Sequence, residues 1–109
     1  MEPSPDILRG TLDLLVLRTL SLQPMHGWGI CERVQQLSRS ALTVNQGSLY
    51  LAIQRLESRG WIDGEWQKTD SNRRARFYHL TAKGRRAAEE ETAAWQRYAA
   101  AVDSIIAAT

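Results

Sequence analysis

The chain has 109 residues, of which 43% are hydrophobic and 24% charged, and its formal net charge is +2. This length and composition are typical of one small globular domain, and no apolar run approaches the roughly 20 residues of a membrane-spanning helix. The lone Cys31 excludes an internal disulfide and a site made of several cysteines. Residues 1–6 lack the basic and apolar regions of a signal peptide, so we expect a cytoplasmic protein.

Residues 7–22 predict a helix that is apolar on two sides, with Leu12 and Leu15 on one row and Leu14 and Leu17 on another. One row suits the core of the domain itself. The other row needs a second buried surface, for which a second subunit is a candidate. The alternative is a helix sunk in a single core, for which so small a domain has little interior.

A proline and a glycine in residues 23–27 interrupt this pattern, and a second helix is predicted over residues 26–38. Its inward row is expected to be Ile30, Val34 and Leu37, with Cys31 packed beside them as a small hydrophobic residue.

Residues 45–60 predict a short amphipathic helix, with Asn45 as its N-cap and Gly60 as its C-terminal stop. The inward residues are Leu49, Ala52, Ile53 and Leu56. The opposite face carries groups that phosphates and base edges accept: Gln46, Ser48, Tyr50, Gln54 and Arg55. We expect this helix to read DNA, with Asn45 at its edge. Tyr50 is either a core aromatic or a DNA contact, and the filled inward row favours the contact.

Residues 61–67 and 74–80 are rich in aromatic and branched side chains and flank a polar turn at 69–73, which predicts a β-hairpin. A hairpin that follows three helices makes the element a winged helix. Residues 68–86 carry seven basic residues and one acidic residue, a charge of +6, whereas the charge after Arg86 is −3. The expected contacts to phosphates or a minor groove are Lys68, Arg73, Arg74 and Arg76. The alternative is a solvated charged face.

Thr81 is expected to cap a last helix over residues 82–107, along which Trp95, Tyr98, Val102 and Ile105 follow one another at the spacing of a helix-pairing seam. The expected dimer interface consists of Leu14, Leu17, Trp95, Tyr98, Val102 and Ile105. Trp95 and Tyr98 have two interpretations. They are either seam packing or the walls of a pocket for a planar hydrophobic or cationic effector.

The predicted fold class is mainly α with a small β-hairpin. A winged helix-turn-helix, residues 1–81, is followed by a C-terminal dimerisation helix, residues 82–109, in one structural unit. His26, Cys31 and His79 lack the spacing of a metal site, and no nucleophile lies beside a base in the sequence. We therefore expect neither an enzyme nor a bound metal or cofactor, and the expected partners are double-stranded DNA and a second copy of the chain, with no membrane.

Six short motifs occur in order along the chain: PMHGW at 24–28, GSLY at 47–50, RLE at 55–57, GWI at 60–62, RFY at 76–78 and LT-x-x-G at 80–84. Together they resemble the PadR family of bacterial transcriptional regulators, from about residue 7 to residue 106. The resemblance implies a winged-helix repressor that dimerises through its C-terminal helix and binds a palindromic operator. Some short members of the family stack planar cationic compounds on a tryptophan of that helix, and Trp95 occupies about the corresponding place.

The chain departs from the family at two positions where proline is usual, which here are Gln46 and Leu51. Gln46 leaves a backbone N–H available to a phosphate, and Leu51 is either an exposed hydrophobic residue or extra packing. One rival function stays open. A winged helix can serve protein-protein contact, with the basic hairpin binding an acidic partner, and net charge does not separate this function from DNA binding.

Overall fold

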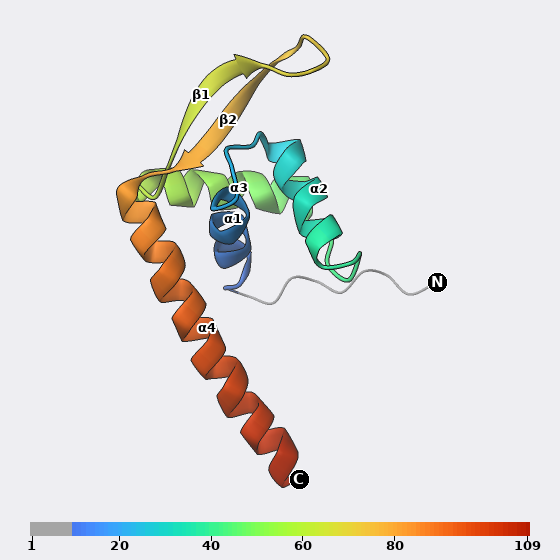
Figure 1. The fold of residues 1–109 in the computed structure, drawn as a ribbon, viewed down its shortest axis with the longest axis vertical. Coiled ribbons are helices and arrows are strands. Elements are labelled where there is room, and N and C mark those ends of the chain that lie inside the picture. The colour runs from blue at the N-terminus through green and yellow to red at the C-terminus, as the bar shows by residue number, and fades with distance from the viewer. Residues whose placement is uncertain (1–9) are drawn as a thin grey trace.

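The computed structural model describes residues 10–109. They form helices α1 (Leu12–Leu20), α2 (Gly27–Leu37) and α3 (Gln46–Ser58), strands β1 (Ile62–Lys68) and β2 (Arg74–Leu80), and helix α4 (Ala82–Ala108). Figure 1 shows a mainly helical fold with one hairpin and a long C-terminal helix, which confirms the predicted fold class. The first helix is shorter than predicted. Residues 7–9 lie outside the described residues, and Gly10 has a φ of 87°, so the helix starts only at Leu12.

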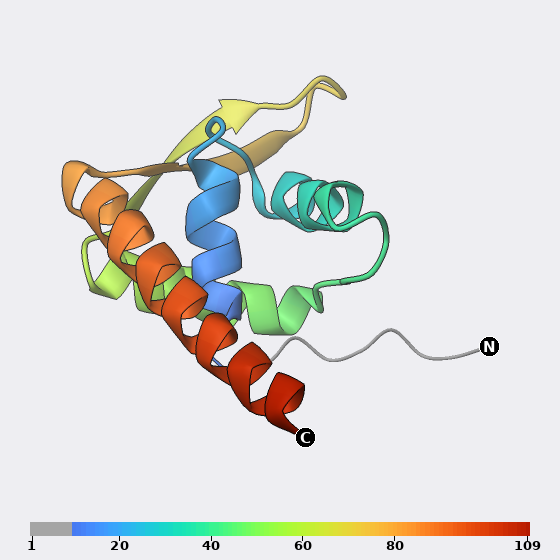
Figure 2. The same cartoon turned by 60° about the horizontal axis from the view of Figure 1, so that its bottom comes forward.

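Helix α1 is the centre of the core, and in Figure 2 it stands between α4 and α2 with α3 at its base. The largest fully buried side chains are Leu17, Ile30, Leu56 and Val16, which come from all three N-terminal helices. Full burial of each such side chain contributes about 1.5–3 kcal/mol of transfer free energy. Leu17 is 0% exposed, so its assignment to a dimer interface was wrong: it packs inside its own subunit.

Helix α2 spans Gly27–Leu37, one residue shorter at each end than the predicted range of 26–38. Its N-cap is His26, whose Nδ1 accepts a hydrogen bond from the Gly29 N–H at 3.0 Å. Ile30 and Val34 are buried, and Cys31 packs against the core, as predicted. Leu37 is 62% exposed, so its inward placement was wrong. It is the last residue of α2, where the chain turns away from the core into the connection to α3.

Helix α3 forms as the sequence predicts. The Asn45 Oδ1 accepts from the Ser48 N–H at 3.1 Å, and the predicted inward row of Leu49, Ala52, Ile53 and Leu56 is buried. The backbone turns at Gly60, where φ is 75°. Tyr50 is 62% exposed, which excludes a role in the core, and Leu51 is also exposed rather than packed.

The hairpin is antiparallel and in register from the pair Ile62 and Leu80 at its root to the pair Lys68 and Arg74 at its tip. Residues 69–73 form the turn, where the Thr69 N–H donates to the Arg73 carbonyl at 2.7 Å. Met25 bridges to Tyr78 through two backbone hydrogen bonds of 2.9 and 3.1 Å. The segment between α1 and α2 therefore anchors the root of the wing.

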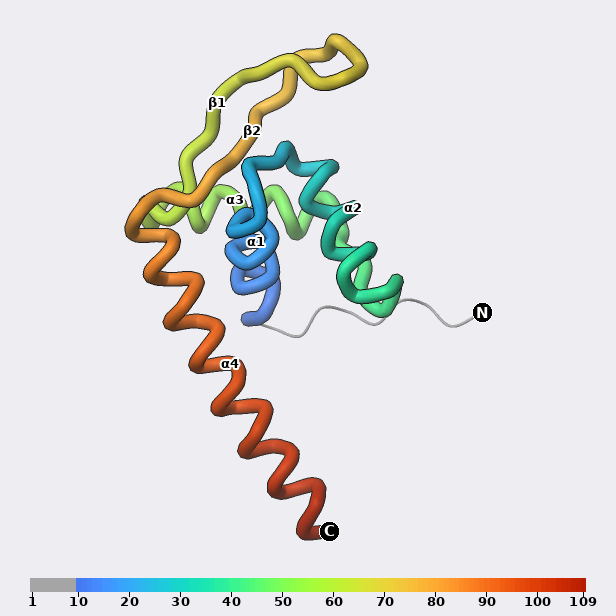
Figure 3. The backbone as a smooth tube through the Cα atoms, viewed as in Figure 1, coloured from blue at the N-terminus to red at the C-terminus, as the bar shows by residue number. Residues whose placement is uncertain are grey.

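Helix α4 begins where predicted, because the Thr81 Oγ1 accepts from the Gly84 N–H at 3.0 Å. Its fully buried residues are Gly84, Ala87 and Ala88, all near its start. Its 27 residues span about 40 Å at 1.5 Å per residue. The backbone trace in Figure 3 shows the second half of α4 running past the other helices and the hairpin, so within residues 10–109 no other element covers much of this helix.

Candidate nucleic-acid interface

The outer face of α3 presents the polar groups that the sequence predicted for DNA contact. Gln46, Ser48, Tyr50 and Gln54 are all exposed, and Asn45 lies beside them as the cap of the helix. Further along the helix a shallow surface is lined by Leu51, Gln54, Arg55, Ser58 and Arg59. Hydrogen-bonding side chains thus occur on the outward surface from the first turn of α3 to its end, with the exposed Leu51 among them.

Ion pairs hold α3 from two sides. On one side, the Arg55 Nη2 contacts Asp13 Oδ1 of α1 at 2.6 Å. This hydrogen bond raises the pKa of Arg55 above its ordinary value. On the other side, the Arg76 Nη2 of β2 contacts Glu57 Oε2 at 2.9 Å. The two pairs link α3 to α1 and to the wing, beside the buried row that packs the helix into the core.

Arg76 therefore differs from what the sequence predicts. Its guanidinium is paired with Glu57, and its side chain lies across Gly64, where an added Cβ would collide with it. It also stands 5.8 Å from the centre of the Tyr78 ring. Burial raises the pKa of the Tyr78 hydroxyl, which keeps this side chain neutral over a wider pH range. Arg76 braces the wing against α3, and we leave it out of the proposed DNA contacts.

The tip of the wing carries the exposed charges. Lys68, Arg73 and Arg74 are exposed, and among residues 10–109 none of them has an ion-pair partner. The Arg74 guanidinium lies 5.3 Å from the centre of the Trp66 ring, a cation–π arrangement that restrains it. The tip thus offers three cations to solvent.

Two exposed tryptophans near the wing tip, Trp28 and Trp66, are not among the site residues that the sequence predicts. Trp28 lies at the start of α2 and faces the wing tip across a groove that Arg73 and Arg74 also line. Trp66 lies on β1 on the same strand face as the buried Ile62, four residues further out. Strand alternation places Trp66 on the inward face, but the hairpin extends beyond the core at that point.

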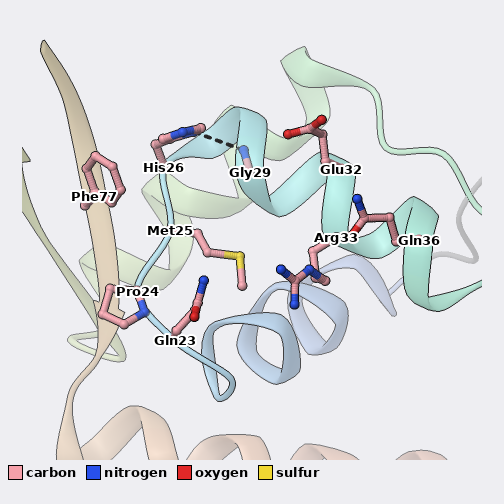
Figure 4. Close-up of a pocket in the computed structure, with 9 residues that line it drawn as sticks. All are labelled: Gln23, Pro24, Met25, His26, Gly29, Glu32, Arg33, Gln36 and Phe77. Atoms are coloured by element: carbon pink, nitrogen blue, oxygen red, sulfur yellow. Dashed lines mark hydrogen bonds between the residues drawn. The ribbon is translucent and has the colours of Figure 1, made fainter. Parts of the chain in front are cut away.

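His26, which the sequence excludes from a metal site, has a structural role. Beside its cap bond to Gly29, its ring meets the edge of Phe77 with centroids 5.0 Å apart and planes at 78°. Figure 4 shows these groups around a small hollow between α2 and β2, with Met25 below them. Within residues 10–109, no three His, Cys, Asp or Glu side chains are grouped so that they could hold a metal ion.

A second groove lies between α1 and α4, away from the basic tip. It is lined by Gly10, Thr11, Leu14, Glu91, Ala94, Trp95 and Tyr98. The Trp95 and Tyr98 rings stand 6.1 Å apart at 39°. The structure therefore brings together Leu14, Trp95 and Tyr98 of the predicted interface. Further along α4, Val102 is half-buried and Ile105 exposed.

None of the helices described in residues 10–109 combines the length and the apolar character that crossing a membrane requires.

Comparison with known proteins gives one family and a consistent set of folds. Residues 16–90 match the transcriptional regulator PadR-like family. A transcriptional regulator from Clostridium thermocellum superposes with a TM-score of 0.81 at 21% identity, over 89% of this chain and 94% of that one. A PadR family regulator from Clostridium difficile gives 0.75 at 24% identity, over 89% and 99%. A PadR family regulator from Eggerthella lenta gives 0.74 at 30% identity, over 90% and 83%.

Proposed function

Since this chain belongs to the PadR-like family of transcriptional regulators, we propose that it binds double-stranded DNA as a homodimer and represses transcription from a palindromic operator. The observation that carries the proposal is the combination of an exposed polar helix face and an exposed basic wing tip in one domain.

Each part of the interface has a separate task in this proposal. Helix α3 enters the major groove, where Gln54 is suited to bidentate contact with adenine. Gln46, Ser48 and Tyr50 contact phosphates or base edges, and Asn45 sets the start of the helix. Lys68, Arg73 and Arg74 neutralise phosphates or enter the adjacent minor groove, which adds affinity and salt dependence but little sequence reading.

The dimer is proposed from α4. Tyr98 and Ile105 are exposed apolar side chains on a helix that extends past its own domain, with Val102 between them on the same row. Pairing this row with its symmetry mate covers both copies. A two-fold axis then places two α3 helices on one face of DNA, and the operator takes the same symmetry.

The groove between α1 and α4 is proposed to take a planar hydrophobic or cationic effector. Trp95 and Tyr98 offer flat aromatic walls, and Glu91 offers a negative charge. A molecule bound there would change the angle between the two subunits and so the spacing of the reading helices. A planar cation should quench tryptophan fluorescence in the native chain but not in a Trp95→Ala variant that still dimerises. Equal quenching in that variant would count against this pocket.

The function itself is tested by gel shift on the DNA upstream of the chain's own gene, compared with a scrambled duplex of the same length at two salt concentrations. The proposal predicts tighter binding to the upstream DNA at both concentrations. Equal binding to the two duplexes would reject sequence-specific recognition and favour the rival, a protein-protein contact module.

A further inference from the structure

The carboxylate of Asp13, in the first turn of α1, forms ion pairs with two arginines, Arg55 of α3 and Arg59 at the C-cap of α3. Its Oδ1 accepts from the Arg55 Nη2 at 2.6 Å, and its Oδ2 accepts from the Arg55 Nε at 3.4 Å. The same Oδ2 lies 3.6 Å from the Arg59 Nη1. Arg59 is also held from another direction, because its guanidinium stands 5.0 Å from the centre of the Trp61 ring.

These two arginines belong to the surface that the proposed function turns toward DNA. Arg55 and Arg59 line the same shallow surface as Leu51 and Gln54, and their side chains are 47% and 50% exposed, whereas Asp13 is 20% exposed. Unpaired arginines at this place would contact the phosphates of any duplex, since phosphate contacts attract without reading sequence.

We infer that Asp13 is a specificity-determining, positioning residue of the DNA-binding face. By pairing with Arg55 and Arg59 it withholds two cations from non-specific phosphate contact, so that discrimination is left to the polar groups of α3 such as Gln54. This inference rests on the proposed DNA binding by α3. It assigns a role in recognition to a residue of α1, outside α3 and the wing.

A purely structural role for Asp13 predicts something different. If the carboxylate only fastens α1 to α3, its removal lowers thermal stability and weakens binding to every duplex by the same factor. Loss of the withholding role instead strengthens binding to unrelated DNA. The direction of the change in non-specific affinity therefore separates the two roles.

The test measures Kd for a sequence-specific duplex and for a scrambled duplex over a series of salt concentrations, alongside thermal unfolding. Asp13→Asn should tighten binding to the scrambled duplex about tenfold at low salt, steepen the salt slope by about one to two units per subunit and lower the specificity ratio. Asp13→Glu keeps the charge and should restore the ratio. Glu90→Gln makes the same charge change on an exposed position of α4 and should leave the ratio unchanged.

A second variant tests whether the tighter non-specific binding of Asp13→Asn depends on the two arginines. When Asp13→Asn is combined with Arg55→Gln and Arg59→Gln, the carboxylate is removed together with both of its partners, so binding to the scrambled duplex should stay within about twofold of the native chain instead of tightening. Tightening in this combined variant equal to that in Asp13→Asn alone would overturn the inference, as would a specificity ratio in Asp13→Asn that equals the ratio in Glu90→Gln. If the native chain itself fails to distinguish the two duplexes at any salt concentration, the proposed function fails and the inference fails with it.

Discussion

Replacing Arg73 and Arg74 with glutamine removes two of the three exposed cations at the wing tip. Both side chains are exposed and lack ion-pair partners among residues 10–109, so the fold should persist. If each arginine neutralises one phosphate, the proposed dimer loses four phosphate contacts, and counterion release flattens the slope of log K against log salt by about 3.6 units. If the two proteins bind equally at about 1 M salt, this difference in slope makes the variant about 4,000-fold weaker than the native chain at 0.1 M salt.

The assay is a titration of fluorescently labelled duplex by anisotropy at four or five salt concentrations, with both specific and scrambled DNA. The matched control is Arg18→Gln with Arg97→Gln, which removes the same charge from exposed positions of α1 and α4. The wing variant should lose affinity for both duplexes by a similar factor. A wing variant with the native slope, or one no weaker than the control, would refute the assignment of the wing to the DNA backbone.

Three further predictions concern the dimer and the fold. Ile105→Glu places a charge on the exposed row of α4 and should weaken dimerisation about 100-fold in sedimentation velocity, with an unchanged helical spectrum; an intact dimer would contradict the seam. Gly84→Ala should destabilise the chain by about 1–3 kcal/mol in urea unfolding, because the added Cβ collides with the Trp61 carbonyl, whereas Gly29→Ala meets only ordinary contacts and should cost nothing. Burial raises the pKa of Tyr78 above 10.0, so the neutral hydroxyl contributes fully to the free energy of unfolding below pH 10.0, and this contribution is lost as the pH rises further. In urea unfolding at a series of alkaline pH values, Tyr78→Phe should therefore lose stability less steeply than the native chain.

The parts of the fold that the sequence predicts correctly depend on short-range chemistry. Asn45 and Thr81 cap their helices through bonds to residues three positions away, and such bonds are visible as residue types at fixed spacing. The inward row of α3 is equally local. The hairpin was predictable because its two strands flank a polar turn, although β1 starts at Ile62, one residue later than expected.

The errors have a different origin, because apolar periodicity does not say which face a neighbour covers. Leu17 lies on a second apolar row of α1 and was assigned to a partner, but α2, α3 and α4 surround that helix and bury it. Leu37 continues the inward row of α2 one turn too far. The domain therefore buries Leu17 of the second row, whereas Leu14 of the same row is half-buried and lines the groove beside α4.

The ion pairs that organise the candidate site were also beyond the sequence. Arg55 and Asp13 are 42 residues apart, and Arg76 and Glu57 are 19 apart. Nothing in local spacing selects these partners from the other charged residues. Local spacing therefore groups Arg76 with the wing-tip cations, and only the packing of α1 against α3 brings Asp13 to Arg55.

The central claim, that α3 reads base sequence, is tested most directly by selecting bound duplexes from a random library with the native chain and with Gln54→Ala. The account predicts a palindromic consensus, with half-sites separated by about 10–10.5 base pairs or a multiple of that spacing. In Gln54→Ala, one symmetry-related base pair of each half-site should lose at least about tenfold in preference, while the salt slope stays native. Identical consensus sequences and preferences from the two proteins would contradict the claim for Gln54, and a native chain that selects no consensus would contradict sequence reading by α3 altogether.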